Sequence, residues 1–599
     1  MDKPAFSTIR SSLIGTVVMV CSVGDEVAEG SVVAVIESMK MEHLVLAMFS
    51  GTIQSVMVEL GEGVRDGSIL VELKIGSTQT ERVLDASRST SPHLSELRDR
   101  VALLQDDARP DAVEKRRARG LRTARENLDD LLDAGSYVEY GRFAYAAQRA
   151  RRSAEELIAR TPADGLISGI GTVGGRPTAA ISYDATVLAG TQGQRNHAKK
   201  DRLLDLVARQ RLPLVFFTEG GGGRPGDTDF PVVTGLNTEA FHAFASLSGL
   251  VPTIGIAAGR CFAGNAAIFG CCDVAIAVEG ASIGMGGPAM IEGGGLGIVD
   301  ADAVGPVSVH VEAGSVDLVA RDEAHAVALA KQLLGFSARS VEPGMADPIE
   351  RLETILPLDR RRAYDAHDVL AALFDHESIL ELRSGFGRSI ITAFARLEGR
   401  PVGVVANNPL VNSGAIDADA ADKASRFFQL ADAWGLPILS LVDTPGFMVG
   451  PEAERTGLVR HVSRMFVAGA ALSVPVVALI TRRGYGLGAQ AMCSGSFVAP
   501  LLTVAWPQAE LGGMGLEGAV RLGFKRELDA IRSEEERAQA FDAMVAAAYE
   551  HGRALNVAAH LELDDVIDPL DTRRIIGQTL DHAVNLGLAE PRRRFVDPA

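Results

Sequence analysis

Short hydrophobic runs separated by glycine turns fill the first 75 residues. Val32–Glu37 and His43–Met48 have the length and composition of strands in a partly buried sheet. The pattern also repeats within itself, so that the region consists of two similar halves. The repeated elements are Gly15-Thr16-Val17 with Gly51-Thr52-Ile53, Gly24 with Gly61, Val27 with Val64, and Gly30 with Gly67. We therefore predict a small, quasi-symmetric all-β sandwich.

A second repeat organises the rest of the chain. In each copy a helix with a 3.6-residue hydrophobic period precedes an apolar strand, Leu214–Phe217 or Ile438–Val442, which leads into a glycine-bearing loop. Corresponding positions lie 224 residues apart (399 − 175): Gly175 with Gly399, Pro213 with Pro437, Glu219 with Asp443, and Gly226 with Gly450. Repeated units of this kind are typical of mainly parallel sheets covered by helices. We therefore expect two similar α/β domains.

These patterns divide the chain into four parts. Residues 1–75 form the sandwich, and residues 76–95, rich in serine and threonine, form a flexible linker. The two α/β domains span 96–345 and 346–599, with a boundary in the proline-containing segment 340–348. The charged segment Leu94–Leu132 has a helical pattern, which we interpret as a solvated structural helix.

Lys40 is the first candidate for chemistry. It lies in Glu37-Ser38-Met39-Lys40-Met41-Glu42, in the tight turn between the two strands named above. A lysine exposed on such a turn is a point where an enzyme attaches a biotin or lipoyl arm, and methionine on both sides is the biotin form of the signature. We predict that biotin is bound covalently to Lys40, with Met39 and Met41 beside it. The alternative is an unmodified carrier-like sandwich.

Two equivalent turns of small residues are the second candidate. Ala263-Gly264-Asn265-Ala266 and Leu487-Gly488-Ala489-Gln490 each follow a buried strand and begin a helix. The first N–H groups of a helix have no partner within it, and glycine lets a ligand come close to them. We predict that Gly264 and Asn265, and separately Gly488 and Ala489, hold an oxyanion. The alternative is that the glycines only permit tight packing of strand on helix.

Composition narrows the class of protein. The formal net charge of −18 argues against nucleic acid as a partner, because binding phosphates needs a basic surface. The five cysteines show no Cys-x-x-Cys spacing, so no metal site is predicted and the reducing cytoplasm is the expected location. No segment approaches the roughly 20 apolar residues of a membrane span. The apolar run Leu13–Val23 imitates a secretory signal, but it matches the internal repeat and is interpreted as a strand.

Residues 5–74 resemble a biotin carboxyl carrier domain, and residues 96–599 resemble the carboxyltransferase subunit of biotin-dependent acyl-CoA carboxylases. The stretches that carry the second resemblance are Gly259–Asn265, Ile283–Pro288, Asp443–Phe447, Gly484–Ala489 and Trp506–Glu510. The order of carrier and transferase is similar to the C-terminal part of single-chain long-chain acyl-CoA carboxylases. The resemblance implies a multidomain chain in which an all-β biotinyl sandwich precedes two domains of the crotonase fold.

The resemblance also implies an activity. Carboxybiotin on Lys40 carries a carboxyl group to the α carbon of an acyl-CoA, in a ligase reaction that belongs to fatty acid metabolism. Gly264 and Asn265 bind the thioester oxygen, and Gly488 and Ala489 bind the ureido oxygen of biotin. Asn265 departs from the glycine common in propionyl-type relatives, which puts the pocket shape in doubt. Gly190 and Gly193, before the helix that holds Lys199 and Lys200, either help to bind coenzyme A or form a plain turn.

Partners follow from the same family. We expect a separate biotin carboxylase subunit, because the chain leaves no room for one, a biotin protein ligase, and a hexamer of carboxyltransferase subunits. One alternative is the carboxyltransferase subunit of a transcarboxylase or a biotin-dependent decarboxylase. Another is a non-catalytic scaffold that docks biotin domains. The acyl chain length is not fixed by the sequence.

Overall fold

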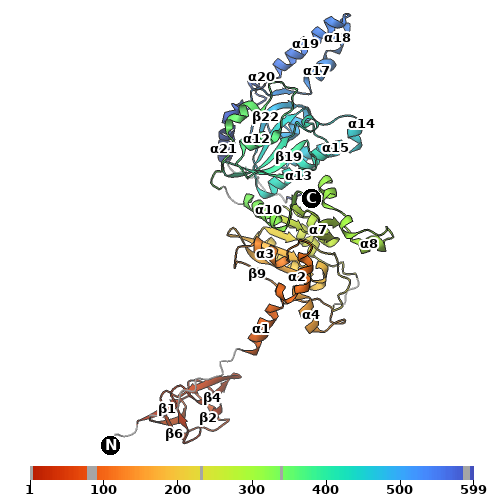
Figure 1. Cartoon of the computed structure of the whole chain (residues 1–599). Coiled ribbons are helices and arrows are strands. Elements are labelled where there is room, and N and C mark those ends of the chain that lie inside the picture. Colours follow the sequence, from red (N-terminus) through yellow and green to blue (C-terminus); the bar gives the residue numbers. More distant parts are fainter. Residues whose placement is uncertain (1–4, 77–90, 230–233, 338–340, 584–593, 599) are drawn as a thin grey trace. The chain divides into compact units, whose positions relative to one another are not determined.

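The computed structural model describes residues 5–76, 91–229, 234–337, 341–583 and 594–598. The chain forms two compact units, Met1–Arg98 and Asp99–Ala599 (Figure 1). Most of the predicted linker, residues 77–90, lies outside the described residues. The predicted domain boundaries stay predictions.

The first unit is a sandwich of two four-stranded sheets, which confirms the predicted carrier fold. The sheets have the orders β1-β8-β6-β3 and β5-β4-β2-β7. Their inner faces bury Val17, Ile36, Ile53 and Leu70. The internal repeat appears as three pairs of equivalent strands, β2 with β6, β3 with β7 and β4 with β8. The strands are β1 (Phe6–Arg10), β2 (Gly15–Val20), β3 (Glu26–Val27), β4 (Val32–Ser38), β5 (Met41–Leu46), β6 (Gly51–Val56), β7 (Gly63–Val64) and β8 (Ile69–Ile75).

The segment expected to form a single helix over 94–132 contains three helices, and the first of them spans the division between the two units at Arg98. Pro110 starts a new helix after a short 3-10 turn, Gly120 adopts a positive φ of 74°, and the capping box of Thr123 and Glu126 starts a third helix. The observed helices are α1 (Pro92–Ala102), α2 (Pro110–Arg117) and α3 (Ala124–Leu131). The third helix buries Leu128 and Leu131, so only part of this segment is solvated.

The first half of the second unit contains a seven-stranded sheet of order β17-β15-β13-β12-β11-β10-β9. β10 and β11 form an antiparallel hairpin, and the strands from β11 to β17 are parallel. A small parallel sheet pairs β14 with β16. The strands are β9 (Val138–Glu139), β10 (Leu166–Val173), β11 (Arg176–Tyr183), β12 (Leu214–Phe217), β13 (Thr253–Ala257), β14 (Arg260–Phe262), β15 (Val274–Val278), β16 (Ser282–Gly284) and β17 (Leu318–Ala320). The helices are α4 (Ala154–Arg160), α5 (Gln194–Gln210), α6 (Ala240–Ala245), α7 (Gly264–Gly270), α8 (Pro288–Gly293), α9 (Val307–Glu312) and α10 (Glu323–Phe336).

The second half repeats this plan in a sheet of order β18-β19-β20-β21-β22-β23-β25, with β24 beside β22. The strands are β18 (Leu380–Leu382), β19 (Ile390–Leu397), β20 (Arg400–Asn407), β21 (Ile438–Thr444), β22 (Val476–Tyr485), β23 (Leu502–Ala505), β24 (Glu510–Gly512) and β25 (Asp565–Val566). The helices are α11 (Leu352–Ile355), α12 (Ala366–Leu373), α13 (Ala418–Trp434), α14 (Pro451–Arg455), α15 (Leu458–Ala470), α16 (Gly486–Met492), α17 (Leu516–Gly523), α18 (Lys525–Ala530), α19 (Glu534–His551), α20 (Ala554–Ala559) and α21 (Thr572–His582). Helices α5 and α13 start and end 224 residues apart, and so do strands β10 and β19. This confirms the predicted duplication.

The two halves share one hydrophobic core. Phe336 of α10 packs on Phe394 of β19, with ring centroids 5.5 Å apart, and Phe394 stacks on Trp434 of α13 at 5.3 Å. Arg426 of α13 reaches into the first half and donates to a carboxylate oxygen of Asp317 at 3.1 Å. These contacts are buried, so the two halves are fixed against each other.

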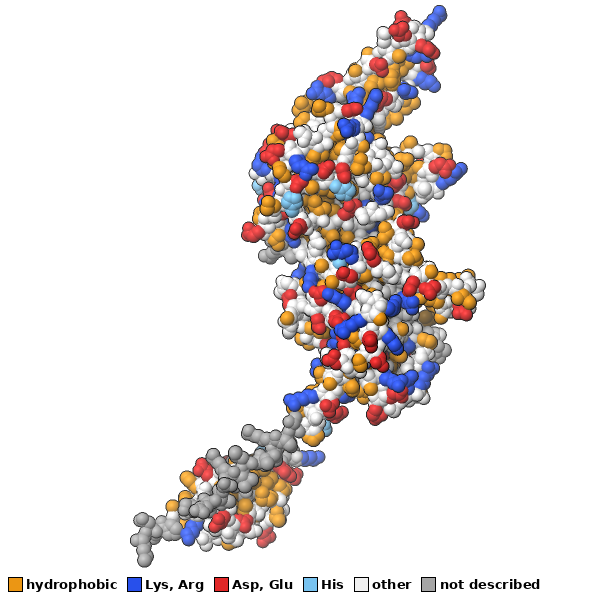
Figure 2. Space-filling model, viewed as in Figure 1, with side chains coloured by type: hydrophobic (Ala, Val, Ile, Leu, Met, Phe, Trp, Pro, Cys, Tyr) orange, Lys and Arg blue, Asp and Glu red, His pale blue; other side chains and the backbone are white. Residues whose placement is uncertain are grey.

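Charged residues of both signs lie on the surface of the second unit, together with exposed apolar side chains such as Ile298 and Leu358. Figure 2 shows Lys and Arg interspersed with Asp and Glu over its visible face. The hairpin of α17 and α19 projects from the second half, and α8 projects from the first (Figure 1). Met290, Ile291 and Glu292 are helical in α8. In the described part of the chain, no helix has the length and apolar character that crossing a bilayer requires.

Candidate active site

Lys40 lies at the tip of a two-residue hairpin turn. Strands β4 and β5 pair so that Ser38 faces Met41, which leaves Met39 and Lys40 to form the turn. Both have positive φ, 51° and 66°, the combination that a type I′ turn requires. β5 therefore starts at Met41, two residues before the predicted start, because the turn is this tight.

The turn exposes the side chains around Lys40. Met39 is 95% exposed and Met41 66% exposed, and Lys40 itself is exposed. Attachment of biotin through an amide requires a lysine amine that an enzyme can reach, and the described residues form no hydrogen bond or ion pair with this one. The residues present therefore fit the cofactor.

The first predicted turn has the geometry of an anion site. Ala263 has φ 52° and ψ −121°, a conformation rare for a residue with a side chain, and it directs the chain into α7. The backbone N–H groups of Gly264 and Asn265 are not bonded to any other described residue. Gly264 is half-buried, and a Cβ there would lie 2.9 Å from the side chains of Gln192 and Phe241. A side chain at position 264 would thus displace the ends of these two side chains and restrict access to the N–H groups.

The second predicted turn is its counterpart at an offset of 224 (488 − 264). Gly486 has φ 60° and starts α16, and the N–H groups of Gly488 and Ala489 likewise find no acceptor among the described residues. A Cβ on Gly488 would lie 2.7 Å from the backbone carbon of Gly446. A cavity of about 580 Å³ opens beside Gly486, lined also by Phe497, Leu511 and His551.

Asn265 contributes more than a backbone N–H. Its side chain is fully buried and donates to the carbonyl oxygen of Thr218 at 3.1 Å. Its own oxygen accepts from the backbone N–H of Gly222 at 3.1 Å and from Gln192 at 3.0 Å. This role of the side chain is not evident from the motif around Gly264. A comparison of the two copies could have indicated it, because the polar residues Gln192 and Asn265 correspond to the apolar residues Ile416 and Ala489.

Gly190 and Gly193 are explained by close packing. A Cβ on Gly190 would lie 2.8 Å from the carbonyl oxygen of Glu219, and one on Gly193 would lie 2.4 Å from the guanidinium of Arg224. Ser413 and Gly414 repeat the turn of Ala189 and Gly190, again with positive φ. A role in binding coenzyme A stays a prediction.

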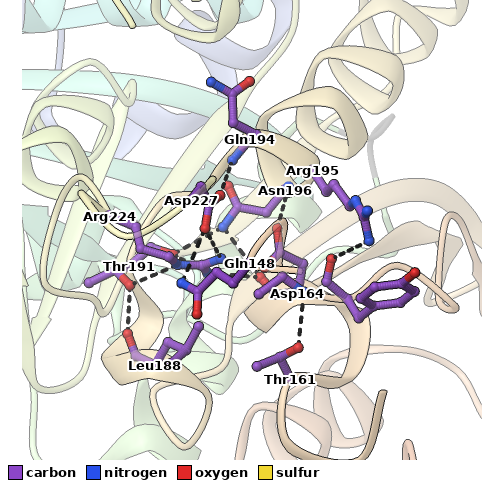
Figure 3. Close-up of polar contacts among 12 residues, drawn as sticks. Gln148, Thr161, Asp164, Leu188, Thr191, Gln194, Arg195, Asn196, Arg224 and Asp227 are labelled. Atoms are coloured by element: carbon purple, nitrogen blue, oxygen red, sulfur yellow. Dashed lines mark hydrogen bonds and ion pairs between the residues drawn. The ribbon is translucent and has the colours of Figure 1, made fainter. Parts of the chain in front are cut away.

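Arg224 is the centre of the polar network drawn in Figure 3. Its guanidinium donates to a carboxylate oxygen of Asp164 at 2.5 Å and to the backbone oxygen of Thr191 at 2.9 Å. Asp227 in turn accepts from the N–H of Gln194 at the start of α5 at 2.8 Å. The network fastens the glycine loop that ends at Arg224 to the first turn of α5.

Two carboxylates occupy equivalent positions near the ends of β12 and β21, and arginine neutralises both. Glu219 accepts two hydrogen bonds from Arg116, at 3.0 and 2.6 Å. Asp443 accepts from Arg482 at 3.0 Å and from Arg483 at 2.6 Å. Neither carboxylate is therefore free to act as a base.

Two partly buried histidines of the transferase make structural contacts. His310 bonds the carbonyl oxygen of Ile283 at 2.9 Å, and His461 pairs with Asp422 at 3.1 Å. Within the described ranges, no three His, Cys, Asp or Glu side chains cluster as a metal ion requires.

Comparison with known protein families agrees with this geometry. The family described as carboxyl transferase domain matches residues 115–595, and the family described as biotin-requiring enzyme matches residues 4–73. The chain is 35% identical over 490 residues to the methylmalonyl-CoA carboxyltransferase 12S subunit of Propionibacterium freudenreichii subsp. shermanii, covering 78% of this chain and 90% of that protein. It is 33% identical over 526 residues to the biotin-dependent long chain acyl-coenzyme A carboxylase beta4 subunit of Mycobacterium tuberculosis, covering 84% and 96%.

Two solved structures extend the comparison. A single-chain, multi-domain long-chain acyl-CoA carboxylase is 50% identical with a TM-score of 0.78, over 97% of this chain; the match spans 56% of that longer chain. The transcarboxylase 12S structure, described as a hexamer with methylmalonyl-CoA bound, is 32% identical with a TM-score of 0.76, over 85% of this chain and 99% of that one.

The chain therefore belongs to the carboxyl transferase family, with a biotin carrier domain in the same polypeptide. It is a fused biotin carrier and carboxyltransferase of the biotin-dependent acyl-CoA carboxylase type, similar to long-chain acyl-CoA carboxylase. Biotin is the covalent cofactor of its carrier domain. These findings confirm the predicted family, fold class, enzyme class and cofactor.

Proposed function

We propose that this protein transfers a carboxyl group from biotin on Lys40 to the α carbon of an acyl-CoA. The observation that carries the proposal is the presence, in one chain, of an exposed carrier lysine and two equivalent turns whose backbone N–H groups bond no described residue. The similarity to acyl-CoA carboxylases over nearly the whole chain supports it.

The backbone groups of the two turns have separate tasks. Biotin, when bound, would supply the carboxyl group in an activated form, and the ureido nitrogen that gives it up would take the α-proton. Gly264 and Asn265 donate their N–H groups to the thioester oxygen, which becomes negative when the α-proton leaves. Gly488 and Ala489 donate to the ureido oxygen of the cofactor. Removing one fixed donor of this kind costs about 10²–10³-fold in rate.

The surrounding side chains keep the turns fixed. Asn265 holds the loop of Thr218 and Gly222, and Gly488 lies directly against the backbone of Gly446. Donors that are already in place need no reorganisation when charge develops, and this is what makes them effective. The arginine partners of Glu219 and Asp443 keep those carboxylates from repelling an anion at either turn.

The remaining partners are proposed from the family. Residues 4–73 and 115–595 match carrier and transferase, so we assign the ATP-dependent carboxylation of biotin to a separate biotin carboxylase subunit. A biotin protein ligase must modify Lys40. The hexamer described for the transcarboxylase 12S relative supports a hexamer here. The five cysteines are unpaired thiols, which supports a reducing, cytoplasmic location.

The test is an assay of the biotinylated full-length protein with its biotin carboxylase subunit, ATP and labelled bicarbonate. Acetyl-, propionyl-, branched, unsaturated and long-chain CoA esters serve as acceptors. We expect acid-stable label in at least one acyl-CoA, and none when Lys40 is replaced by Arg. Lack of label with every ester contradicts the proposal.

A second function is favoured by specific relatives. The methylmalonyl-CoA carboxyltransferase 12S subunit, and the methylmalonyl-CoA decarboxylase subunit alpha of Veillonella parvula at 32% identity, belong to the same family. A transcarboxylase moves the carboxyl group of an acyl-CoA to an oxo-acid without ATP. Transfer that proceeds with methylmalonyl-CoA and an oxo-acid, and not with ATP and bicarbonate, would select this alternative.

A further inference from the structure

A chain of buried side chains leads from α5 to the first turn. The ammonium of Lys200 donates to the side-chain oxygen of Gln192 at 2.9 Å and to the hydroxyl of Tyr183 at 2.8 Å. The amide nitrogen of Gln192 donates to the side-chain oxygen of Asn265 at 3.0 Å. Lys200 and Asn265 have no exposed surface, and Gln192 is 4% exposed. Water therefore does not compete for these bonds.

The chemistry of the lysine sets the direction of the whole chain. Burial lowers the pKa of Lys200 to about 7. Below that pH the amine is protonated and only donates, so the oxygen of the Gln192 amide must face Lys200. Its nitrogen then faces Asn265, which must present its own oxygen. That orientation leaves the nitrogen of Asn265 to donate to Thr218 and its oxygen to accept from the N–H of Gly222. Rotating either amide by 180° would place two donors or two acceptors against each other.

The end of this chain is the glycine loop beside the first turn. The side-chain nitrogen of Asn265 lies 2.3 Å from the position of a Cβ on Gly220. A Cβ on Gly222 would lie 2.8 Å from the Cβ of Ala263, the residue that directs the chain into Gly264. The loop, Asn265 and the turn are thus in direct contact.

The backbone of Gln192 holds the same loop. Its N–H donates to Gly222 at 2.7 Å, and its carbonyl accepts from the N–H of Arg224 at 2.8 Å. Arg224 is itself anchored on Asp164, as Figure 3 shows. The hydrogen-bonded side chains from Lys200 to Asn265 also hold the loop, and their orientation depends on Lys200 alone.

We propose that Lys200 is a positioning residue for carboxyl transfer to the acyl-CoA, acting through Gln192 and Asn265 on the turn at Gly264. It does not touch the substrate. The inference rests on the proposed function of that turn. It assigns to Lys200 the task of keeping two amides and a glycine loop in one arrangement while negative charge develops on the thioester oxygen.

The second α/β half of the transferase shows that the fold does not need this row of hydrogen-bonded side chains. The positions that correspond to Lys200, Gln192 and Asn265 are Ala424, Ile416 and Ala489, all of them buried and apolar. The neighbouring lysine, in contrast, occurs in both copies as Lys199 and Lys423. The polar chain is thus confined to the half assigned to the acyl-CoA, and its loss should leave the cofactor side unaffected.

The experiment compares Lys200→Met with Lys423→Met in the biotinylated full-length protein. Lys423 is an equally buried lysine that donates to the backbone oxygen of Ile390 and contacts neither turn. For Lys200→Met we expect kcat to fall by about 10- to 100-fold with little change in the KM for acyl-CoA, because a small misplacement of catalytic groups has effects of this size. Lys423→Met should keep both constants.

Two further measurements make the result specific. Gln192→Glu keeps an acceptor for Lys200 but cannot donate to Asn265, so it should lower kcat as Lys200→Met does. The double variant Lys200→Met/Gln192→Met should be no slower than the slower single variant, because both substitutions interrupt the same row of hydrogen bonds. Hydrogen exchange of the peptide that contains Gly222 should quicken in Lys200→Met and stay unchanged in Lys423→Met.

The outcomes separate the two proposals. Wild-type kcat and unchanged exchange at Gly222 in Lys200→Met overturn the role of Lys200 while leaving the proposed function intact. A parallel fall of kcat and thermal stability in both lysine variants also overturns it, because that result indicates a general loss of folding. A third outcome combines faster exchange at Gly222 in Lys200→Met with no carboxyl transfer by the wild-type protein. That result supports the positioning role of Lys200 and contradicts the proposed function.

Discussion

Lys199 and Lys423 make the same buried contact in the two halves of the transferase. Each donates its ammonium to the backbone carbonyl at the start of the hairpin strand, Leu166 in the first half and Ile390 in the second. Both pairs are related by the offset of 224. The duplication therefore preserves this buried contact as well as the backbone.

These two lysines predict a rise of stability with pH. Burial lowers the pKa of each to about 8, whereas the ordinary value is 10.5. Between these values the unfolded chain keeps protons that the folded chain has released, so the free energy of unfolding increases as the pH rises. Thermal unfolding of the wild type and of Lys199→Met/Lys423→Met measures this effect. From pH 7 to 9.5 the Tm of the wild type should gain a few degrees relative to the variant.

The sign of that difference is the decisive result. One pKa unit corresponds to about 1.4 kcal/mol, so even partial expression of the two shifts is measurable. A difference in Tm that is constant over this range, or that falls with pH, contradicts the assignment.

Lys40 predicts a simple test of modification. Lys40→Arg keeps the positive charge and the turn but removes the side-chain amine to which biotin is joined by an amide bond. The purified protein should therefore lose its avidin-reactive adduct completely. Lys74→Arg is the matched control, because Lys74 is an exposed lysine on strand β8 of the same sandwich. It should be biotinylated like the wild type. An avidin blot of proteins expressed with ample ligase decides between these outcomes.

The two turn glycines should differ in their tolerance of a methyl group. In Gly488→Ala the new Cβ meets backbone atoms of Gly446, which cannot move away cheaply, whereas in Gly264→Ala it meets the side-chain ends of Gln192 and Phe241. Overpacking of this kind costs about 1–3 kcal/mol. We expect Gly488→Ala to have the lower Tm and the lower rate of transfer.

Gly523→Ala provides the control for this comparison. A Cβ at Gly523, the last residue of helix α17, has no atom within 4 Å. The substitution should leave both Tm and transfer rate at wild-type values. An equal loss in Gly264→Ala and Gly488→Ala would contradict the packing argument.

Arg426 is expected to be essential for the contact between the halves. It is buried and bonds the carboxylate of Asp317 and the backbone oxygen of Asp273. Replacing it with Met leaves these first-half oxygens with fewer donors, and breaking a buried ion pair costs about 3–5 kcal/mol. Arg426→Met should therefore lower the Tm strongly, while Arg455→Met, at an exposed ion pair with Glu452, should change it little. Differential scanning calorimetry of the two variants checks this.

Much of the architecture follows from local pattern. The glycine turns and short strands of the carrier, the tight turn at Lys40 and the offset of 224 were all predicted and are found. The single helix over 94–132 was wrong, because Pro110 and Gly120 interrupt it and the capping box at Thr123 restarts it. The roles assigned to Gly264, Asn265, Gly488 and Ala489 stay predictions, although their geometry suits them.

The sequence by itself determined the carrier, the exposed turn that holds Lys40 and the duplicated transferase, because hydrophobic periods, turn residues and repeats can be read along the chain. Only the tertiary structure decided which polar groups meet. Arg116 reaches Glu219 across 103 positions, and Lys200 reaches Asn265 through Gln192 in one copy alone. Such contacts depend on how distant strands and helices pack, and no local period encodes that packing.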